Sequence, residues 1–319
     1  RNFIMYNMWQ QGIISEEDYR NGAAQPLVLA EEDTNKKTSS VTSYFTDALF
    51  NEVVKDIMAK EGVDESTAQS MLYTGGYTIE ATVNPKMQTA MENLMLNEGD
   101  AYFPAGWHEE EVTSISDDDV QVMNEDGTPK TRVAEDGTVY YYRNVRTQAA
   151  MVTLDYDGNV LAIAGGLGEK TKSLSLNRAY SVERQTGSTI KPIAVYAPAI
   201  ELGASPASVV YNMPVPIKGW TGSDGKDTWP RNYNTSSYVG PETLRNAIRK
   251  SNNVSAAQTL MTMVGVDRSV DFLLRMGVDS DHIDATPYGL SLGSSGITPL
   301  QLTVAYGVLA NAGVYQEPI

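Results

Sequence analysis

The feature that most limits the fold of this chain is a pair of short apolar runs joined by a turn. A long helical stretch follows them in the sequence. Residues 150–154 (AMVTL) and 160–164 (VLAIA) have strand composition, and the Asp-Tyr-Asp-Gly sequence between them is a turn signal. After about residue 186 the pattern is mostly helical, with long Gly- and Asn-rich connections. A local hairpin followed by helices is typical of an α+β fold, so we predict an antiparallel sheet with helices packed on it.

The first half of the chain has further helix and strand signals. Apolar residues at every fourth position predict an amphipathic helix over residues 45–60. Asn84, followed by proline, predicts the start of another helix, and Ser15 is placed to cap a short one. Residues 78–83 (TIEATV) alternate in the manner of a strand.

Residues 98–149 differ in character and predict a small β-rich excursion. Glu-Asp-Gly-Thr, a turn sequence, occurs twice in this region, and residues 139–142 (VYYY) have strand composition. The acidic runs at 109–111 and 117–119 leave a Ca²⁺ site open, but no EF-hand spacing is present. A solvated acidic face is therefore the interpretation that we favour.

Charge and residue usage exclude several classes of function. The 24 basic and 40 acidic residues give a net charge of −16, which argues against binding to nucleic acids or anionic lipids because their phosphates repel the chain. The absence of cysteine removes thiol nucleophiles, disulfides, iron–sulfur clusters and Cys-based zinc sites. The two histidines, His108 and His282, exclude a His-rich metal site and are the only candidate bases for a Ser-His-Asp triad.

The length and the ends of the chain bear on its organisation. The 319 residues have room for about two domains. No apolar run approaches about 18 residues, so the sequence predicts no transmembrane helix, and no signal peptide is visible. The chain opens on Arg1 rather than methionine, and we interpret it as a fragment whose missing anchor says little about the parent protein.

The strongest candidate for chemistry is the segment 187–192 (GSTIKP). Its spacing of three residues places the Lys191 amine over the Ser188 hydroxyl within one helical turn. A serine hydroxyl is a weak nucleophile that needs a neighbouring base, and a lysine serves as that base only when it is neutral. Burial lowers the pKa of a lysine, and the N–H groups at a helix N-terminus stabilise an oxyanion, so this pair suits acyl transfer without histidine.

Two other serines compete for this assignment. Ser223 precedes Lys226 with the same spacing, but the pair lies in a Gly/Asp turn with no helical pattern after it. Residues 289–293 (GLSLG) match the G-x-S-x-G nucleophile elbow around Ser291, which needs a strand before it and a histidine after it in the sequence. The segment before Ser291 is polar and contains proline, and no histidine follows, so we favour neither serine.

A second polar pair follows a helix that we predict over residues 241–250, with its buried side marked by Leu244 and Ile248. Ser251 and Asn253 lie between this helix and the next one, which Asn253 is expected to cap. Polar residues between two helices are held rigidly, which suits an active site, although a simple capping role stays open.

The loop 218–238 is rich in Trp, Tyr and Asn. Trp220 and Tyr233 are the candidates for substrate contacts, because aromatic side chains are able to wall a cleft and contact a peptide. A structural role for the same residues is an equal alternative at this point.

Together these segments resemble the transpeptidase domain of class A, or bifunctional, penicillin-binding proteins. Residues 184–192 (RQTGSTIKP) resemble the active-site segment of that family, and residues 251–253 (SNN) fall in the order of its second motif. Three further segments resemble family elements, namely residues 177–179, 240–245 and 293–315. The resemblance implies the α+β fold of penicillin-binding proteins and serine β-lactamases.

The resemblance also implies a serine D,D-transpeptidase of bacterial cell-wall synthesis. It implies that Ser188 attacks the penultimate D-Ala carbonyl of a peptidoglycan stem peptide ending in D-Ala-D-Ala, with Lys191 as general base. Ser251 passes a proton to the leaving amine, and Asn253 hydrogen-bonds the substrate and the lysine. An amine of a neighbouring stem peptide resolves the acyl-enzyme, whereas β-lactam antibiotics leave Ser188 acylated. No metal or organic cofactor is implied.

The family further implies a domain organisation and a location. Residues 1–80 are expected to be a linker region after a glycosyltransferase domain that this chain lacks. Residues 81–319 are expected to form the transpeptidase domain, with the β-rich excursion inside it and its C-terminal part missing. The parent protein is expected to be membrane-anchored, with this domain on the extracytoplasmic face.

Two departures from the family pattern are visible. Thr186 stands where the family usually has proline. The third motif, Lys-Thr/Ser-Gly, is absent, and we expect that it lies beyond Ile319, because the family places it on a later strand. Without that strand we expect an unpaired edge on the hairpin at 150–164, and the fragment is catalytically impaired unless the missing part is supplied.

Two alternatives on the same fold stay open. A serine β-lactamase shares this chemistry but hydrolyses its acyl-enzyme with water, and nothing in the sequence identifies the extra base. A non-catalytic β-lactam-sensing or scaffold domain is also compatible, since the third motif is not in view. The rate of hydrolysis of a bound β-lactam distinguishes the first alternative, and turnover of a D-Ala-D-Ala peptide distinguishes the second.

Overall fold

The computed structural model describes residues 1–25, 41–98, 107–115, 120–234 and 238–319. The chain divides into two compact units, Arg1–Val41 and Thr42–Ile319. In the first unit, helices α1 (Asn2–Gln10) and α2 (Glu16–Ala24) pack on each other. The rings of Trp9 and Tyr19 stack with 5.3 Å between their centroids, and Ser15 caps α2 as predicted.

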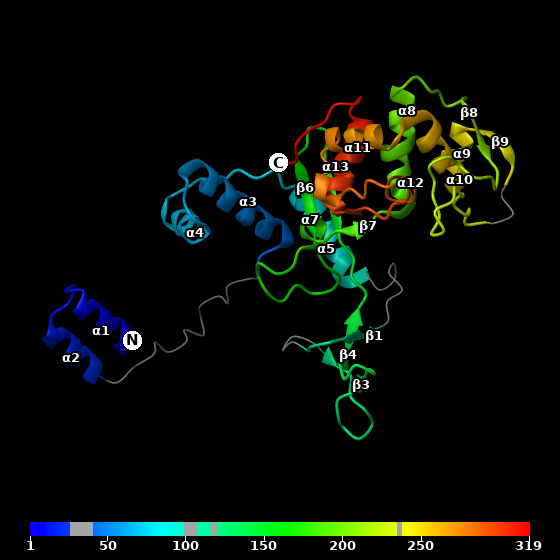
Figure 1. Ribbon diagram of the computed structural model, residues 1–319. Helices are drawn as coiled ribbons and strands as arrows, with labels where there is room; N and C mark the ends of the chain where they lie inside the picture. Colours follow the sequence, from blue (N-terminus) through cyan, green and yellow to red (C-terminus); the bar gives the residue numbers. More distant parts are fainter. Residues whose placement is uncertain (26–40, 99–106, 116–119, 235–237) are drawn as a thin grey trace. The chain divides into compact units, whose positions relative to one another are not determined.

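The second unit begins with α3 (Tyr44–Glu61) and α4 (Glu65–Thr74), which lie side by side (Figure 1). Gly62 ends α3 in the left-handed conformation with φ at +67°. The strand predicted at 78–83 is wrong, because the structure assigns no strand there. Much of this segment is exposed to solvent, and Thr82 ties its end to the next hairpin by donating a hydrogen bond to the Val160 carbonyl at 2.7 Å.

The predicted hairpin is confirmed, and only one of its edges is open. Strands β5 (Met151–Leu154) and β6 (Val160–Ala164) pair antiparallel, with Met151 opposite Ala164. Helix α5 (Pro85–Asn93) covers the outer edge of β6, where the Gln88 amide accepts from the Ile163 N–H and donates to its carbonyl, both at 2.8 Å. Within the described residues, no such hydrogen bond covers the outer edge of β5 at Val152 and Leu154. The expected unpaired edge therefore belongs to β5.

A four-stranded antiparallel sheet lies where the sequence predicted a β-rich excursion. Strand β4 (Val139–Arg146) is central and pairs with β1 (Trp107–Val112), β2 (Val120–Gln121) and β3 (Thr131–Val133). The carboxylates of Glu109, Glu110 and Glu111 form ion pairs with Lys130, Arg143 and Arg132, respectively. Across the described part of the chain, no group of three or more acidic or histidine side chains is placed to hold a metal ion. The acidic run at 117–119 lies outside the described residues.

The remainder of the chain is helical with short strand pairs, and its apolar core forms around the helix that follows Ser188. Its elements are α7 (Arg178–Ser181), β7 (Arg184–Gln185), η2 (Gly187–Ile190), η3 (Pro192–Tyr196), α8 (Ala197–Glu201), β8 (Val209–Asn212), β9 (Gly240–Thr243), α9 (Leu244–Lys250), α10 (Asn253–Thr259), η4 (Leu260–Val264), α11 (Val266–Arg275), η5 (Ser280–His282), α12 (Pro287–Leu292), β10 (Gly296–Ile297) and α13 (Pro299–Ala310). Strand pairs β7–β10 and β8–β9 are antiparallel. Antiparallel strands with helices packed on them confirm the predicted α+β class.

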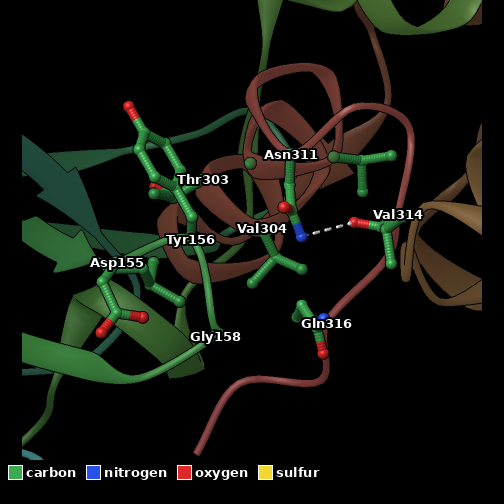
Figure 2. A pocket seen from close by; sticks show the side chains of 11 residues that line it. Asp155, Tyr156, Gly158, Thr303, Val304, Asn311, Val314 and Gln316 are labelled. Atoms are coloured by element: carbon green, nitrogen blue, oxygen red, sulfur yellow. Dashed lines mark hydrogen bonds between the residues drawn. The ribbon is translucent and has the colours of Figure 1, made fainter.

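The β5–β6 turn packs against the end of α13 and the tail that follows it. Figure 2 shows the small pocket between them, where the Asn311 side chain donates to the Val314 carbonyl at 3.3 Å. A Cβ at Gly158 would lie 2.6 Å from the Glu317 carbonyl oxygen, so glycine permits this close approach. None of the predicted site residues lines the pocket, which argues against it as the reaction site.

Candidate active site

The turn that carries Ser188 is held by hydrogen bonds to the segment around Gly293, which comes much later in the sequence. Strand β7 leads into it and pairs with β10, and the Gly187 N–H donates to the Gly293 carbonyl at 3.0 Å. A Cβ at Gly293 would lie 2.0 Å from the Gly187 carbonyl oxygen. Gly293, which matched the nucleophile-elbow pattern, thus serves to let two backbones meet beside Ser188.

Ser188 lies in the 3₁₀ turn η2, and its side chain is exposed to solvent. The Nζ atom of Lys191, one turn later, lies 3.0 Å from the Ser188 Oγ atom. In the described part of the chain, no carbonyl accepts a hydrogen bond from the Ser188 N–H. That N–H group is therefore available to an oxygen that develops negative charge next to the hydroxyl.

Lys191 is buried among oxygen atoms, with only 1% of its surface exposed. Its Nζ lies 2.5 Å from the Asn253 Oδ1, 2.9 Å from the Ser251 carbonyl and 3.2 Å from the Ser251 Oγ. Among the described residues, no carboxylate forms an ion pair with it. Burial without a counter-charge disfavours the ammonium form and lowers the pKa of Lys191 from 10.5 to about 8.

This environment suits a neutral amine. A neutral lysine has two N–H donors and one lone pair, whereas the ammonium ion has three donors and no acceptor. The Asn253 Oδ1 and the Ser251 carbonyl only accept hydrogen bonds, so they take the two N–H groups. The lone pair is then left for the proton of a hydroxyl, and the Ser188 Oγ lies within reach at 3.0 Å. The site thus has the geometry of a nucleophile with its base.

Ser251 reaches Lys191 from a backbone conformation that is unusual for its residue type. It ends α9 in the left-handed region with φ at +52° and ψ at +39°. A residue with a Cβ occupies this region at a cost of about 1–2 kcal/mol. The conformation directs both the carbonyl and the hydroxyl of Ser251 to Lys191, so the strain coincides with the candidate site.

Three expectations about this part of the chain are wrong. The helix predicted from residue 241 begins only at Leu244, because residues 240–243 form β9 paired with β8. Ile248 is 39% exposed, and Ala247 occupies the buried position instead. Helix α10 starts at Asn253 itself, so Asn253 does not cap it and its side chain is free to turn toward Lys191.

The Ser251–Asn253 segment is held by hydrogen bonds to two side chains that the sequence analysis missed. The Asn232 Oδ1 accepts from the N–H of Asn253 at 2.8 Å. The Glu242 Oε1 accepts from the Asn252 amide at 2.8 Å and from a buried serine hydroxyl, that of Ser255, at 2.5 Å. In the sequence, Asn232 is visible only as part of an Asn-rich loop and Glu242 only as part of the predicted helix at 241–250. Neither contact has a periodic signal in the sequence, because Asn232 reaches Asn253 from a loop 21 residues earlier and Glu242 reaches Asn252 from the opposite end of α9.

In the described part of the chain, neither rival serine donates a hydrogen bond to a basic side chain. Ser291 is completely buried in α12, and its hydroxyl donates to the Pro287 carbonyl at 2.5 Å. Ser223 lies exposed in a turn. His282 lies 2.9 Å from the Glu183 carboxylate and 2.8 Å from the Gln301 side chain, so both of its ring nitrogens face groups other than the three candidate serines. The side chain of His108 lies outside the described residues.

The two aromatic candidates differ in their environment. Trp220 is completely buried and packs against Tyr288, with 4.3 Å between ring centroids. This corrects its prediction as a substrate contact, because a ring without exposed surface stabilises the loop rather than walls a cleft. Tyr233 is fully exposed, one residue after Asn232, and its role in substrate binding stays a prediction.

Comparison with known proteins defines the class. Residues 148–319, more than half of the chain, match the family model "Penicillin binding protein transpeptidase domain". The chain therefore belongs to the penicillin-binding protein transpeptidase family. The resemblance to class A members is confirmed by relatives that are named penicillin-binding protein 1A.

The similar proteins are longer than this chain. Penicillin-binding protein 1A of Clostridium botulinum is 28% identical over 98% of the chain, and the match spans 35% of that relative's length. The Escherichia coli protein of the same name is 36% identical over 53% of the chain, which spans 19% of the relative. The crystal structure of penicillin-binding protein 1A from Haemophilus influenzae shares the fold, with a TM-score of 0.59 at 23% identity, over 100% of this chain and 52% of that one. Within the described residues, none of the helices has the length and apolar character needed to cross a membrane.

Proposed function

We propose that this chain is a serine D,D-transpeptidase that cross-links peptidoglycan stem peptides through an acyl-enzyme on Ser188. The observation that carries the proposal is the contact of the buried Lys191 amine with the Ser188 hydroxyl, at 3.0 Å, inside a chain of the transpeptidase family. A lysine that is neutral in a useful fraction of molecules at physiological pH replaces the histidine of other serine enzymes.

In the first step the Ser188 Oγ attacks the carbonyl carbon of the penultimate D-Ala, and the hydroxyl proton moves to the Lys191 Nζ. The carbonyl becomes an oxyanion, which the Ser188 N–H is placed to stabilise. The tetrahedral intermediate then collapses, the C–N bond breaks, and terminal D-Ala leaves as an amine. Its proton comes from Lys191 by way of the Ser251 hydroxyl, which lies 3.2 Å from Nζ. Lys191 is then neutral again.

The second step is the reverse chemistry with a new amine. The amine of a neighbouring stem peptide attacks the ester carbonyl on Ser188, gives up a proton to Lys191 through the same contacts, and forms the cross-link. Release of the Ser188 oxygen takes that proton back. A water molecule in place of the amine gives carboxypeptidase activity. A β-lactam undergoes the first step only, because its leaving amine stays tethered to the acyl group.

The surroundings of the reaction are part of the same proposal. The substrates are stem peptides that end in D-Ala-D-Ala, and the location is the extracytoplasmic face of a membrane-anchored parent with a glycosyltransferase domain. We assign residues 81–319 to the transpeptidase domain and residues 1–80 to the region that links it to the glycosyltransferase domain, although residues 42–80 lie in the same compact unit as residues 81–319. The bifunctional relatives that the chain resembles over nearly all its length support this organisation.

Labelling with a fluorescent penicillin, followed by peptide mass mapping, tests the nucleophile. We expect one stable adduct on the peptide that contains Ser188, and none in a Ser188→Ala variant. Ser223→Ala is the matched control, because Ser223 has the same spacing to a lysine but lies in an exposed turn. An adduct on another serine contradicts the assignment of Ser188.

A thioester analogue of D-Ala-D-Ala then tests the reaction. Release of the thiol that increases with an added amino-acid acceptor is the expected sign of acyl transfer. Rapid release of hydrolysed penicillin points to a β-lactamase instead. An adduct with penicillin but no turnover of the thioester points to a sensor or scaffold domain.

A further inference from the structure

The first turn of α10, which carries Asn253, is capped by a residue outside that helix. The neighbouring Asn252 occupies the N-cap position but makes no capping hydrogen bond, because its amide donates to Glu242. Asn232 supplies the cap instead, and its Oδ1 accepts from the N–H groups of Asn253 at 2.8 Å and Val254 at 3.1 Å. Asn232 is only 3% exposed, so water does not compete for this oxygen.

The orientation of the Asn232 amide is fixed from the opposite side. Its Nδ2 donates to the Oδ1 of Asn212 at 2.8 Å, and Asn212 is a completely buried residue at the end of β8. The amide therefore cannot rotate by 180° without placing its NH₂ group against two N–H donors. One line of hydrogen bonds thus joins strand β8, the loop at Asn232 and the start of α10.

The same loop fixes the side chain of Asn253. The Asn253 Nδ2 donates to the carbonyl of Arg231 at 2.7 Å. A carbonyl only accepts, so this contact determines that the Asn253 Oδ1, and not its Nδ2, faces the Lys191 Nζ. In the opposite orientation the Asn253 NH₂ group would donate to the neutral amine and occupy the lone pair that the Ser188 proton requires.

We propose that Asn232 is a positioning residue for acyl transfer, which holds the loop at Arg231 and the first turn of α10 together so that the Asn253 Oδ1 faces Lys191. The inference rests on the proposed function, since it concerns the base of that reaction. Asn232 touches neither the substrate nor the reacting atoms in this scheme, and it acts through Asn253 alone.

Two variants separate positioning from simple stability. Asn232→Ala removes both capping hydrogen bonds and the link to Asn212. Asn232→Asp keeps an oxygen in the capping position and is the conservative variant. Ser269→Ala is the control, because this serine is equally buried and its hydroxyl donates to the Ala194 carbonyl at 2.6 Å, in the core and apart from these contacts.

The measurement is the rate of acylation by a chromogenic penicillin as a function of pH, with folding checked by circular dichroism and thermal unfolding. For Asn232→Ala we expect the plateau rate to fall on the order of 10²-fold, the size of effect that a misplacement of about 1 Å causes. For Asn232→Asp we expect most of the rate to return at high pH, with the midpoint of the profile moved upward, because a carboxylate near Lys191 favours the ammonium form. Ser269→Ala is expected to unfold at a lower temperature with an unchanged pH profile.

The outcomes distinguish failure of the positioning role of Asn232 from failure of the proposed transpeptidase function. If neither the unaltered protein nor Ser269→Ala is acylated, the same measurement is repeated on a chain extended beyond Ile319, where the third motif is expected. If the extended chain is not acylated either, the proposed function fails. If the unaltered protein and Ser269→Ala are acylated and folded Asn232→Ala reacts within about twofold of them with the same pH profile, the positioning role is refuted while the function stands. If Asn232→Ala does not fold, Asn232→Asp decides, and an unmoved midpoint with an unchanged rate refutes the role.

Discussion

Removing the proton from Lys191 by raising the pH changes both the reactivity and the stability of this protein. Burial lowers the pKa of this lysine from 10.5 to about 8. At pH 7 the amine is then neutral in about a tenth of the molecules, compared with about one in 3,000 at the unshifted pKa. The acylation rate is expected to rise about tenfold from pH 7 to a plateau near pH 9, with its midpoint at the pKa of Lys191.

The same pKa difference fixes the sign of a stability effect. Between pH 8 and 10.5 the unfolded state binds more protons at Lys191 than the folded state, so the free energy of unfolding rises with pH in this window. At about 1.4 kcal/mol per pKa unit, the contribution amounts to about 3 kcal/mol. Below pH 8 both states carry the charge, and the full burial penalty is present.

Urea unfolding across pH 7–10.5 measures the effect, with Lys191→Met as the reference. The variant keeps a long side chain but has no titrating group, so the difference between the two proteins isolates Lys191. We expect the unaltered protein to gain about 3 kcal/mol relative to Lys191→Met over this range. A constant difference, together with an acylation midpoint above pH 10, would show that Lys191 is not held neutral by its burial and would refute the reasoning.

Three further substitutions test the frame around the site. Gly293→Ala, which places a methyl group 2.0 Å from the Gly187 carbonyl oxygen, is expected to destabilise the fold by about 3 kcal/mol in thermal unfolding, whereas Gly307→Ala in α13, where nothing lies within 4 Å, should not. Ser251→Gly relieves a left-handed residue worth about 1 kcal/mol but removes the hydroxyl beside Lys191, so unfolding should occur at an equal or higher temperature while acylation slows. Thr186→Pro fits the observed φ of −72° but deletes the N–H that donates to the Ser295 carbonyl at 3.3 Å. The stabilisation by a restricted unfolded chain and the loss of this hydrogen bond are each about 1 kcal/mol, so the unfolding temperature should stay nearly unchanged.

Several features of the fold and the site follow from short stretches of sequence. The hairpin at β5–β6 was readable from two apolar runs and one turn, because both strands and their connection lie within fifteen residues of each other. The contact of Ser188 with Lys191 follows from a spacing of three residues within one turn. The caps at Ser15 and Gly62 depend likewise on residues next to the helix ends.

Other features depend on which segments meet in space. Nothing local distinguishes the buried Trp220 from the exposed Tyr233 in the same loop. The alternation at 78–83 is that of a strand, but within the described residues this segment pairs with no strand. Gly293 matched a nucleophile pattern by chance of spacing, and only its contact with Gly187 explains why glycine is required there.

The sequence by itself determined the family, the class of fold, and the serine and lysine of the candidate site, because these depend on motifs and on periodicities of a few residues. The tertiary structure decided what makes Lys191 a base, since its burial and its contacts with Ser251 and Asn253 join positions about sixty residues apart. It also placed Asn232 against the Asn253 N–H and the Arg231 carbonyl against the Asn253 amide, the two contacts from which we infer the positioning role of Asn232. Solvation and hydrogen-bond geometry arise only after distant segments pack together, and a pKa depends on both.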